Sequence, residues 1–157
     1  MTERPDPTRV VADADVLAAD LLVGGAARPA LDAVRRHSWT TLVASDPLLD
    51  DAAAVVETLA DPALAADWRE RAAALTERVS HPDGDHPAVA SAYHGNAAHL
   101  LTFDASLTTA AANASLKAHV ETSVKRPDAF ARLFDAEPLY EATVGGEYPG
   151  PDRDPRG

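Results

Sequence analysis

The alternation of short apolar runs with longer alanine-rich segments constrains the fold of this chain most. Apolar runs at residues 8–13, 40–45 and 98–103, and a weaker one at 118–124, predict strands. The segments between them carry apolar residues at helical spacing. Because strands that alternate with helices form a parallel sheet with helices on both faces, we expect a three-layer α/β/α fold around a central parallel sheet of four or five strands.

Proline and glycine mark the expected ends of several helices. Ser45 or Asp46 can cap a helix over residues 46–60 with Pro47 in its first turn, and Asp61 with Pro62 does the same for residues 61–79. A pair of glycines separates two earlier helices. The other predicted helices are residues 15–23, 28–37, 88–95, 106–114 and 127–134.

Length and composition favour one globular domain. The sequence predicts a domain over residues 9–143 and a flexible tail over 144–157, which is rich in glycine, proline and charge. The chain has no cysteine, its first ten residues do not resemble a signal peptide, and no apolar run approaches the roughly 18 residues of a membrane span. We therefore expect a cytoplasmic protein without a membrane partner.

Acidic residues dominate the charge of the chain. Aspartate and glutamate number 25 against 14 lysines and arginines, which gives a formal net charge of −11, and only Lys117 and Lys125 are lysines. This balance is typical of proteins from salt-accumulating halophilic archaea, because molar salt reduces the Debye length to roughly 3 Å and screens self-repulsion. The same screening weakens phosphate attraction, so the acidity neither supports nor excludes a nucleic-acid substrate.

Carboxylates follow two of the predicted strands. Asp13 ends the strand 8–13, Asp104 directly follows the strand 98–103, and Asp15 lies two residues after Asp13. If these strands are parallel neighbours, all three side chains lie at the carboxyl edge of the sheet, where open α/β folds bind ligands. Clustered carboxylates need cations, and hard oxygen ligands suit Mg²⁺ or Mn²⁺.

Other acidic residues also fall at strand-to-helix crossings. Asp51 lies near the start of the helix 46–60, and Asp85 and His86 directly precede the helix 88–95. Each position also has a simpler interpretation: Asp51 suits a solvated helix surface, His86 a turn, and Asp15 a helix cap.

Two further clusters admit more than one interpretation. Residues 80–87 contain two histidines and two aspartates that could hold a transition metal, but their spacing matches no standard zinc site. Arg35, Arg36 and His37 could contact a phosphate backbone or could form the basic end of a helix.

Four motifs resemble those of the PIN domain, a nuclease fold of toxin ribonucleases and RNA-processing enzymes. VVADADVL resembles the first block of the family, with Asp13 as its metal-binding acid, and SDPLLDD resembles the second, with Asp51 where glutamate is expected. DHPAVASAYHGNAAHLLTFDASL resembles the third and fourth blocks, and RPDAFARLF resembles the closing helix. The resemblance covers residues 9–135.

The resemblance implies a PIN-like fold and a Mg²⁺- or Mn²⁺-dependent endoribonuclease that hydrolyses phosphodiester bonds. Its implied catalytic acids are Asp13, Asp51, Asp85 and Asp104, and its implied metal ligands are Asp13, Asp15, Asp85, His86 and Asp104. The chain departs from the family pattern in two places. His86 occupies the third acidic position, with Asp85 one residue early, and the second acid is shortened to aspartate.

These departures leave other functions open. The chain could be a catalytically degenerate PIN-like module that binds RNA or protein, and it could form a homodimer or bind a regulatory partner. An α/β domain with a phosphoacceptor aspartate, similar to a response regulator, would also place acids after its first strand and could use Lys125. That third interpretation leaves the LLTFD block unexplained.

Overall fold

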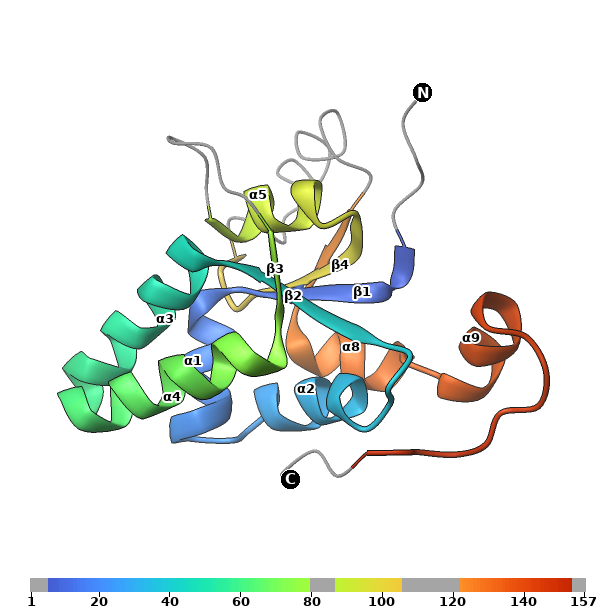
Figure 1. Ribbon diagram of the computed structural model, residues 1–157, viewed down its shortest axis with the longest axis horizontal. Helices are drawn as coiled ribbons and strands as arrows, with labels where there is room; N and C mark the ends of the chain where they lie inside the picture. The colour runs from blue at the N-terminus through green and yellow to red at the C-terminus, as the bar shows by residue number, and fades with distance from the viewer. Residues whose placement is uncertain (1–5, 80–86, 106–121, 154–157) are drawn as a thin grey trace.

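A five-stranded parallel sheet forms the centre of the computed structural model, which describes residues 6–79, 87–105 and 122–153 (Figure 1). The strand order is β3-β2-β1-β4-β5. The strands are β1 (Asp6–Ala12), β2 (Thr41–Ser45), β3 (Glu77–Val79), β4 (Ala97–Leu101) and β5 (Ser123–Lys125). Every neighbouring pair is parallel, which confirms the predicted α/β sheet architecture.

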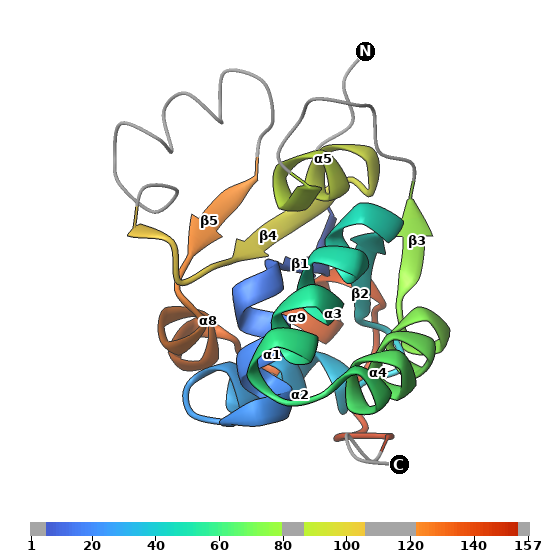
Figure 2. The same ribbon diagram turned by 90° about the vertical axis from the view of Figure 1, so that its left-hand side faces the viewer.

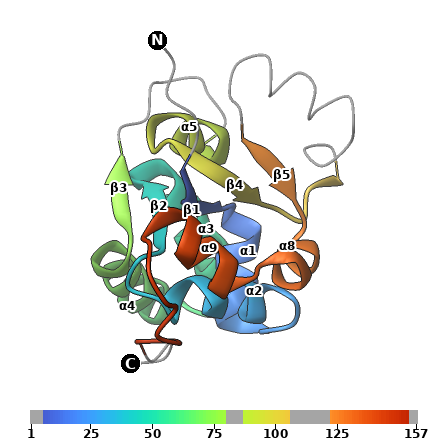
Figure 3. The same cartoon turned by 90° about the vertical axis from the view of Figure 1, so that its right-hand side faces the viewer.

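Helices cover both faces of this sheet, as predicted. They are α1 (Ala14–Leu22), α2 (Ala27–Arg35), α3 (Asp46–Leu59), α4 (Pro62–Leu75), α5 (Pro87–His94), α8 (Pro127–Leu133) and α9 (Ala136–Thr143). Figure 2 shows α5 above the sheet and α1, α2, α4 and α8 below it. Figure 3 shows α9 beside the amino ends of the strands, where it contacts β1. None of the helices in the described part of the chain is long and apolar enough to cross a membrane.

The direction of the crossovers changes between β1 and β4. The chain passes from β1 to β2 and then to β3 through α1–α4, and returns through α5 over the opposite face to β4. The strand order places β2, the strand that follows β1, on one side of this pair and β5, the strand that follows β4, on the other. Folds of this type bind ligands outside the carboxyl ends of the strands at such a switch point.

The core lies on both sides of β1. Val10, Val11 and Ala12 are consecutive and all at most 1% exposed, as expected for a parallel strand that is covered on both faces. Leu100 and Leu101 of β4 are equally buried. In the register of β1 against β4, Val11 is paired with Leu100 and Ala12 with Leu101, so buried residues face buried residues across the pair.

The predicted capping residues begin the helices as expected. Ser45 caps α3 and accepts a hydrogen bond from the Leu48 amide at 3.3 Å. Asp61 caps α4 and accepts one from the Leu64 amide at 2.8 Å. Such caps satisfy amide groups that have no partner within the helix, and proline in the first turn adds a preset backbone angle.

The prediction of one helix over residues 61–79 is wrong at its end. Helix α4 stops at Leu75, Thr76 is extended, and residues 77–79 form β3, which pairs with β2. Pairing with the edge of the sheet satisfies backbone groups that a longer helix would also have satisfied, and an ion pair between Glu77 and Arg9 of β1 adds to it. Tertiary contact therefore overrides local helix propensity here.

Some predicted segments cannot be compared with the structure. The predicted helix 106–114 lies outside the described residues, as does the histidine-containing turn 80–87 except for Pro87. The strand predicted at 118–124 is observed as β5 over Ser123–Lys125, and its residues 118–121 are outside the described part.

The segment predicted as a flexible tail makes specific contacts over residues 144–153. The Asp152 and Arg153 amides both donate to the Arg36 carbonyl at 3.0 Å, and the Asp152 carboxylate accepts from the amide and hydroxyl of Ser38. Tyr148 Oη lies 2.7 Å from His37 Nε2. The side of His37 that could have met a phosphate is thus occupied by the chain itself, and His37 is 3% exposed.

A buried ion pair joins α1 to α2. The Arg35 guanidinium donates to both carboxylate oxygens of Asp20, at 2.8 and 2.9 Å, and Arg28 donates to the Asp20 carbonyl at 2.7 Å. Burial alone would lower the pKa of Arg35, but its hydrogen bonds and charge attraction to Asp20 and Asp32 raise it. The Asp20 side chain is 8% exposed, so a charge left alone here would be poorly solvated.

We expect Asp20→Ala to lower the free energy of unfolding by about 3 kcal/mol, because the change leaves Arg35 buried without its main partner. Urea titration measures this change. The matched control is Glu57→Ala on the exposed surface of α3, which should change stability by less than about 0.5 kcal/mol. Equal stability of the two variants would contradict a structural role for the ion pair.

Candidate functional site at the carboxyl edge of the sheet

The carboxyl ends of β1 and β4 remain paired for one residue beyond the sheet. The Asp13 amide donates to the Leu101 carbonyl at 2.8 Å, which holds residue 13 beside the residues that follow β4. The chain then turns into α1 on one side and continues through residues 102–105 on the other. Side chains at this position line the switch point of the fold.

Asp13 is held by hydrogen bonds from both strand ends. It caps α1, with Oδ1 accepting from the Ala14 amide at 2.8 Å. Its Oδ2 accepts from the Thr102 hydroxyl at 2.9 Å. The side chain is 8% exposed, so Asp13 has one fixed orientation at the edge of the sheet.

Thr102 connects Asp13 to Asp104. Its side chain is fully buried, and its hydroxyl donates to Asp13 while accepting from the Asp104 amide at 3.0 Å. The sequence analysis did not single out Thr102. The available signal was its place directly after a strand that pairs in parallel with β1, which puts it opposite Asp13.

Asp15 is the least satisfied of the three acids. Its Oδ2 accepts from the Phe103 amide at 3.1 Å, whereas its buried Oδ1 has no hydrogen-bond partner among the described residues. Burial raises the pKa of Asp15, and the negative charges of Asp13 and Asp104 raise it further, against the opposing effect of backbone hydrogen bonds. The three carboxylates are therefore close enough to repel one another.

A cation lies over Phe103, the residue between Thr102 and Asp104. The Arg126 guanidinium lies over the Phe103 ring, 5.4 Å from its centroid, and the side chain is about half exposed. Arg126 directly follows β5 and precedes the first residue of α8, so it belongs to the same edge of the sheet. It forms an ion pair with Asp128 at 3.3 Å. The sequence analysis missed Arg126, because its place beside Phe103 depends on the pairing of β4 with β5.

The other predicted acidic residues are placed differently or are not described. Asp51 is exposed on α3, and among the described residues the charges that raise the pKa of Asp15 are Asp13 and Asp104. Asp85 and His86 lie outside the described residues.

The start of α5 reaches the same edge of the sheet. The buried Ser91 hydroxyl donates to the Pro87 carbonyl at 2.7 Å and lies 2.9 Å from the Ser45 hydroxyl, from which it can accept. Ser45 ends β2, so the helix that follows Asp85 and His86 in sequence begins close to the carboxyl end of β2.

Lys125 lies away from the acids, against the side of the sheet that α8 covers. Its Nζ lies 3.2 Å from His99 Nδ1, and the His99 ring packs edge-on against Phe130 of α8. Burial and the Lys125 charge lower the pKa of His99 to about 4. The strand order also differs from the order 2-1-3-4-5 of response regulators, so the structure disfavours that interpretation.

The residues fit a hard cation only in part. Among the described residues, no three His, Cys, Asp or Glu side chains are grouped so that they could hold a metal ion. The unpartnered buried oxygen and raised pKa of Asp15 nevertheless show negative charge that the surrounding protein does not neutralise. Carboxylates and water are the ligands that Mg²⁺ prefers, so Asp13, Asp15 and Asp104 could supply part of a coordination shell.

We expect Asp15→Asn to stabilise the metal-free protein at pH 7 by about 0.5 kcal/mol; the gain is small because Asp15 is only half-buried and water screens part of the repulsion. The raised pKa means that the folded protein favours protonated Asp15, so the cost of its charge grows as pH rises above the ordinary value of 3.8. The gain should therefore shrink toward low pH. Urea titration in a chelator, with Glu57→Gln as the control, measures it; a destabilised Asp15→Asn variant would contradict the predicted repulsion.

The comparisons with known proteins identify a family without assigning an activity. No curated protein and no solved structure matches the chain. A model of a protein family of unknown function, DUF7384, matches residues 4–156. Because this match covers nearly all of the 157 residues, the chain belongs to the DUF7384 family.

Proposed function

We propose that this protein is a PIN-like nuclease that hydrolyses phosphodiester bonds with the help of Mg²⁺ or Mn²⁺ at the carboxyl edge of its sheet. The observation that carries the proposal is the meeting of Asp13, Asp15 and Asp104 at the paired carboxyl ends of β1 and β4, with a buried Asp15 oxygen that has no described partner. Ligand sites of open α/β sheets lie at this position.

Asp13, Asp15 and Asp104 are the residues that would hold the ion. Asp85 or His86 is the further ligand that the resemblance implies. Asp51 remains a proposed catalytic acid on the same basis. When bound, a divalent ion lowers the pKa of a water molecule and neutralises charge on the reacting phosphate.

The residues around the acids would orient them. The Thr102 hydroxyl and the Ala14 amide hold the two oxygens of Asp13, so this carboxylate need not reorganise when a ligand arrives. The Phe103 amide holds Asp15 by one oxygen, and the other oxygen is buried without a described hydrogen-bond partner. Asp13 would therefore be a ligand whose orientation is already fixed, and Asp15 would be a ligand that gains a partner for its second oxygen only when the ion binds.

Arg126 is the group best placed to contact the substrate. A guanidinium binds phosphate oxygens through two parallel hydrogen bonds, and stacking on Phe103 limits its motion. In a chain of net charge −11, such a local cation would offset the repulsion between the acids and a phosphate backbone. RNA is the proposed substrate because of the resemblance to PIN ribonucleases.

We expect calorimetric titration to detect Mn²⁺ binding that Asp13→Asn and Asp15→Asn each weaken by about tenfold or more, since each removes a charged ligand. Glu57→Gln, an equal change of charge away from the edge, should bind like the unchanged protein. Affinity should rise with pH through the raised pKa of Asp15, because the metal competes with its proton.

The same titration decides between the two candidate ligands before α5. Asp85→Ala should weaken Mn²⁺ binding more than His86→Ala, because a carboxylate suits a hard ion better than an imidazole. The reverse result would point to a softer metal. Unchanged binding in Asp13→Asn, Asp15→Asn and Asp85→Ala would reject the site.

We expect the full chain with Mn²⁺ to cleave a structured RNA, and Asp13→Asn or Asp104→Asn to reduce the rate by about 100-fold or more, as for the loss of a group that acts in the transition state. Arg126→Gln should weaken RNA binding, whereas Arg132→Gln, an exposed arginine of α8, should not. Cleavage that survives both aspartate changes would come from a contaminating nuclease.

The second candidate function is a PIN-like module that binds RNA or protein without cleaving it. The absence of a three-residue metal-binding group among the described residues favours it. RNA binding that depends on Arg126, without Mn²⁺ binding and without cleavage, would support this function over the nuclease. RNA cleavage that Asp13→Asn abolishes would reject it.

A further inference from the structure

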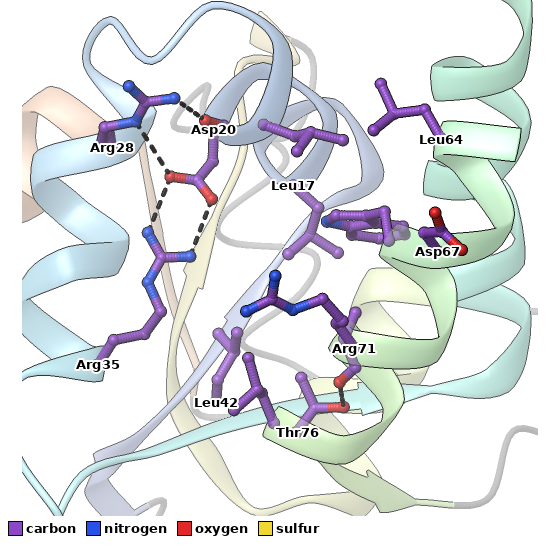
Figure 4. A pocket seen from close by; sticks show the side chains of 13 residues that line it. Leu17, Asp20, Arg28, Arg35, Leu42, Leu64, Asp67, Arg71 and Thr76 are labelled. Carbon is purple, nitrogen blue, oxygen red and sulfur yellow. Dashed lines mark hydrogen bonds and ion pairs between the residues drawn. The ribbon is translucent and has the colours of Figure 1, made fainter. Parts of the chain in front are cut away.

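A separate cleft lies between α1, α2 and α4, on the face of the sheet opposite α5 (Figure 4). Its volume is about 440 Å³, and Leu42 of β2 lies at its base. Helix α1 lines it with Leu17, Asp20 and Leu21, which follow the turn that carries Asp15. Pockets for small molecules usually have volumes of about 300–1,000 Å³ and mostly apolar walls.

Helix α4 presents an apolar stripe to this cleft. Leu64, Trp68, Ala72 and Leu75 recur at spacings of four, four and three residues, and all four line the cleft. A helix normally buries such a stripe against the core. In α4, which the structure describes completely, only Ala65 is fully buried, and Leu75 is 62% exposed. Trp68 and Ala72 pack partly against the core, whereas Leu64 and Leu75 are exposed, so the cleft has an apolar wall that the protein covers only in part.

The arginines that line the cleft differ in their hydrogen bonds and ion pairs. Figure 4 shows Arg28 and Arg35 of α2 both directed toward Asp20. Arg35 makes two hydrogen bonds to that carboxylate and one to Asp32. These two arginines are committed to ion pairs within the protein.

Arg71 of α4 is not paired in this way. It is exposed, and among the described residues it has no hydrogen bond or ion pair, even though Asp67 lies one turn away on the same helix. Figure 4 shows its guanidinium directed from α4 across the cleft toward the side of Arg35 and Asp20. Two carboxylates, Asp20 and Asp67, also line the cleft, but neither forms an ion pair with Arg71. In a chain with 25 acidic and 14 basic residues, an arginine without a described ion pair beside an apolar wall is a specific feature.

We propose that this cleft binds a small molecule with an apolar body and one oxyanion, such as a carboxylate, sulfonate or phosphate monoester. Arg71 would hold the oxyanion through charge-assisted hydrogen bonds. The apolar body would lie on Trp68 and Leu42 and cover the stripe of α4. The ion pair of Asp20 with Arg35 fixes the opposite wall, so that the cleft is largely preformed.

The fluorescent probe anilinonaphthalene sulfonate has this chemistry and tests the proposal on the full chain. We expect saturable binding to one site, which Arg71→Gln weakens by about tenfold through the loss of a charge-assisted hydrogen bond. Arg132→Gln makes the same change on α8 and should bind the probe normally. Ala72→Phe places a ring in the cleft and should block binding.

Trp68 provides a second readout. The chain has two tryptophans, and Trp39 lies instead in an aromatic cluster with His37 and Tyr140. In a Trp39→Phe variant, bound probe should quench Trp68 through energy transfer. Octanoate should displace the probe, octyl phosphate should do the same, and uncharged octanol should be about tenfold weaker.

Three results would overturn the proposal: no probe binding, equal binding to Arg71→Gln and Arg132→Gln, or displacement by octanol as strong as by octanoate. The last two would identify an apolar surface without an anion site. Thermal melts of each variant exclude loss of folding as the cause. Asp13→Asn should bind the probe normally, so the result for the cleft is independent of the proposed nuclease activity.

Discussion

The pairing of β1 with β4 is the interaction on which the rest of this structure depends. The two strands share the most buried part of the core, and the hydrogen bond from the Asp13 amide to the Leu101 carbonyl carries their pairing past the end of the sheet. From this edge the chain leads from β1 to β2 on one side and from β4 to β5 on the other. The core therefore determines where Asp13, Thr102 and Asp104 meet.

Placing three acids at this position works against stability. Asp13 is compensated by two donors, but Asp15 is half-buried beside other negative charges and has one oxygen without a described partner. A structure selected for stability alone would replace or pair such a group. Elsewhere the same helix shows that solution, since Asp20 is buried and fully paired with Arg35. The contrast within α1 separates a structural acid from a functional candidate.

Elements whose signals lie in neighbouring residues could be predicted from the sequence, whereas elements that depend on tertiary contacts could not. The caps of Ser45 and Asp61 are contained in a few neighbouring residues, and the helices begin there. Strand β3 was missed because it forms only against β2. In the candidate site, Asp13 was predictable from the end of an apolar run, whereas the role of Thr102 follows from the register between two strands far apart in sequence.

The contacts of the C-terminal segment bear on how the chain folds. Tyr148 meets His37 across 111 residues of sequence, and Asp152 meets Ser38 across 114. Contacts between residues so far apart in sequence form late, because closing the long loop between them costs conformational entropy. During synthesis, the connection between α2 and β2 therefore remains uncovered until residues 148–152 have been translated. The strands of the sheet, which end with β5 at Lys125, can assemble before that moment, and the segment that carries Tyr148 and Asp152 then closes over this connection.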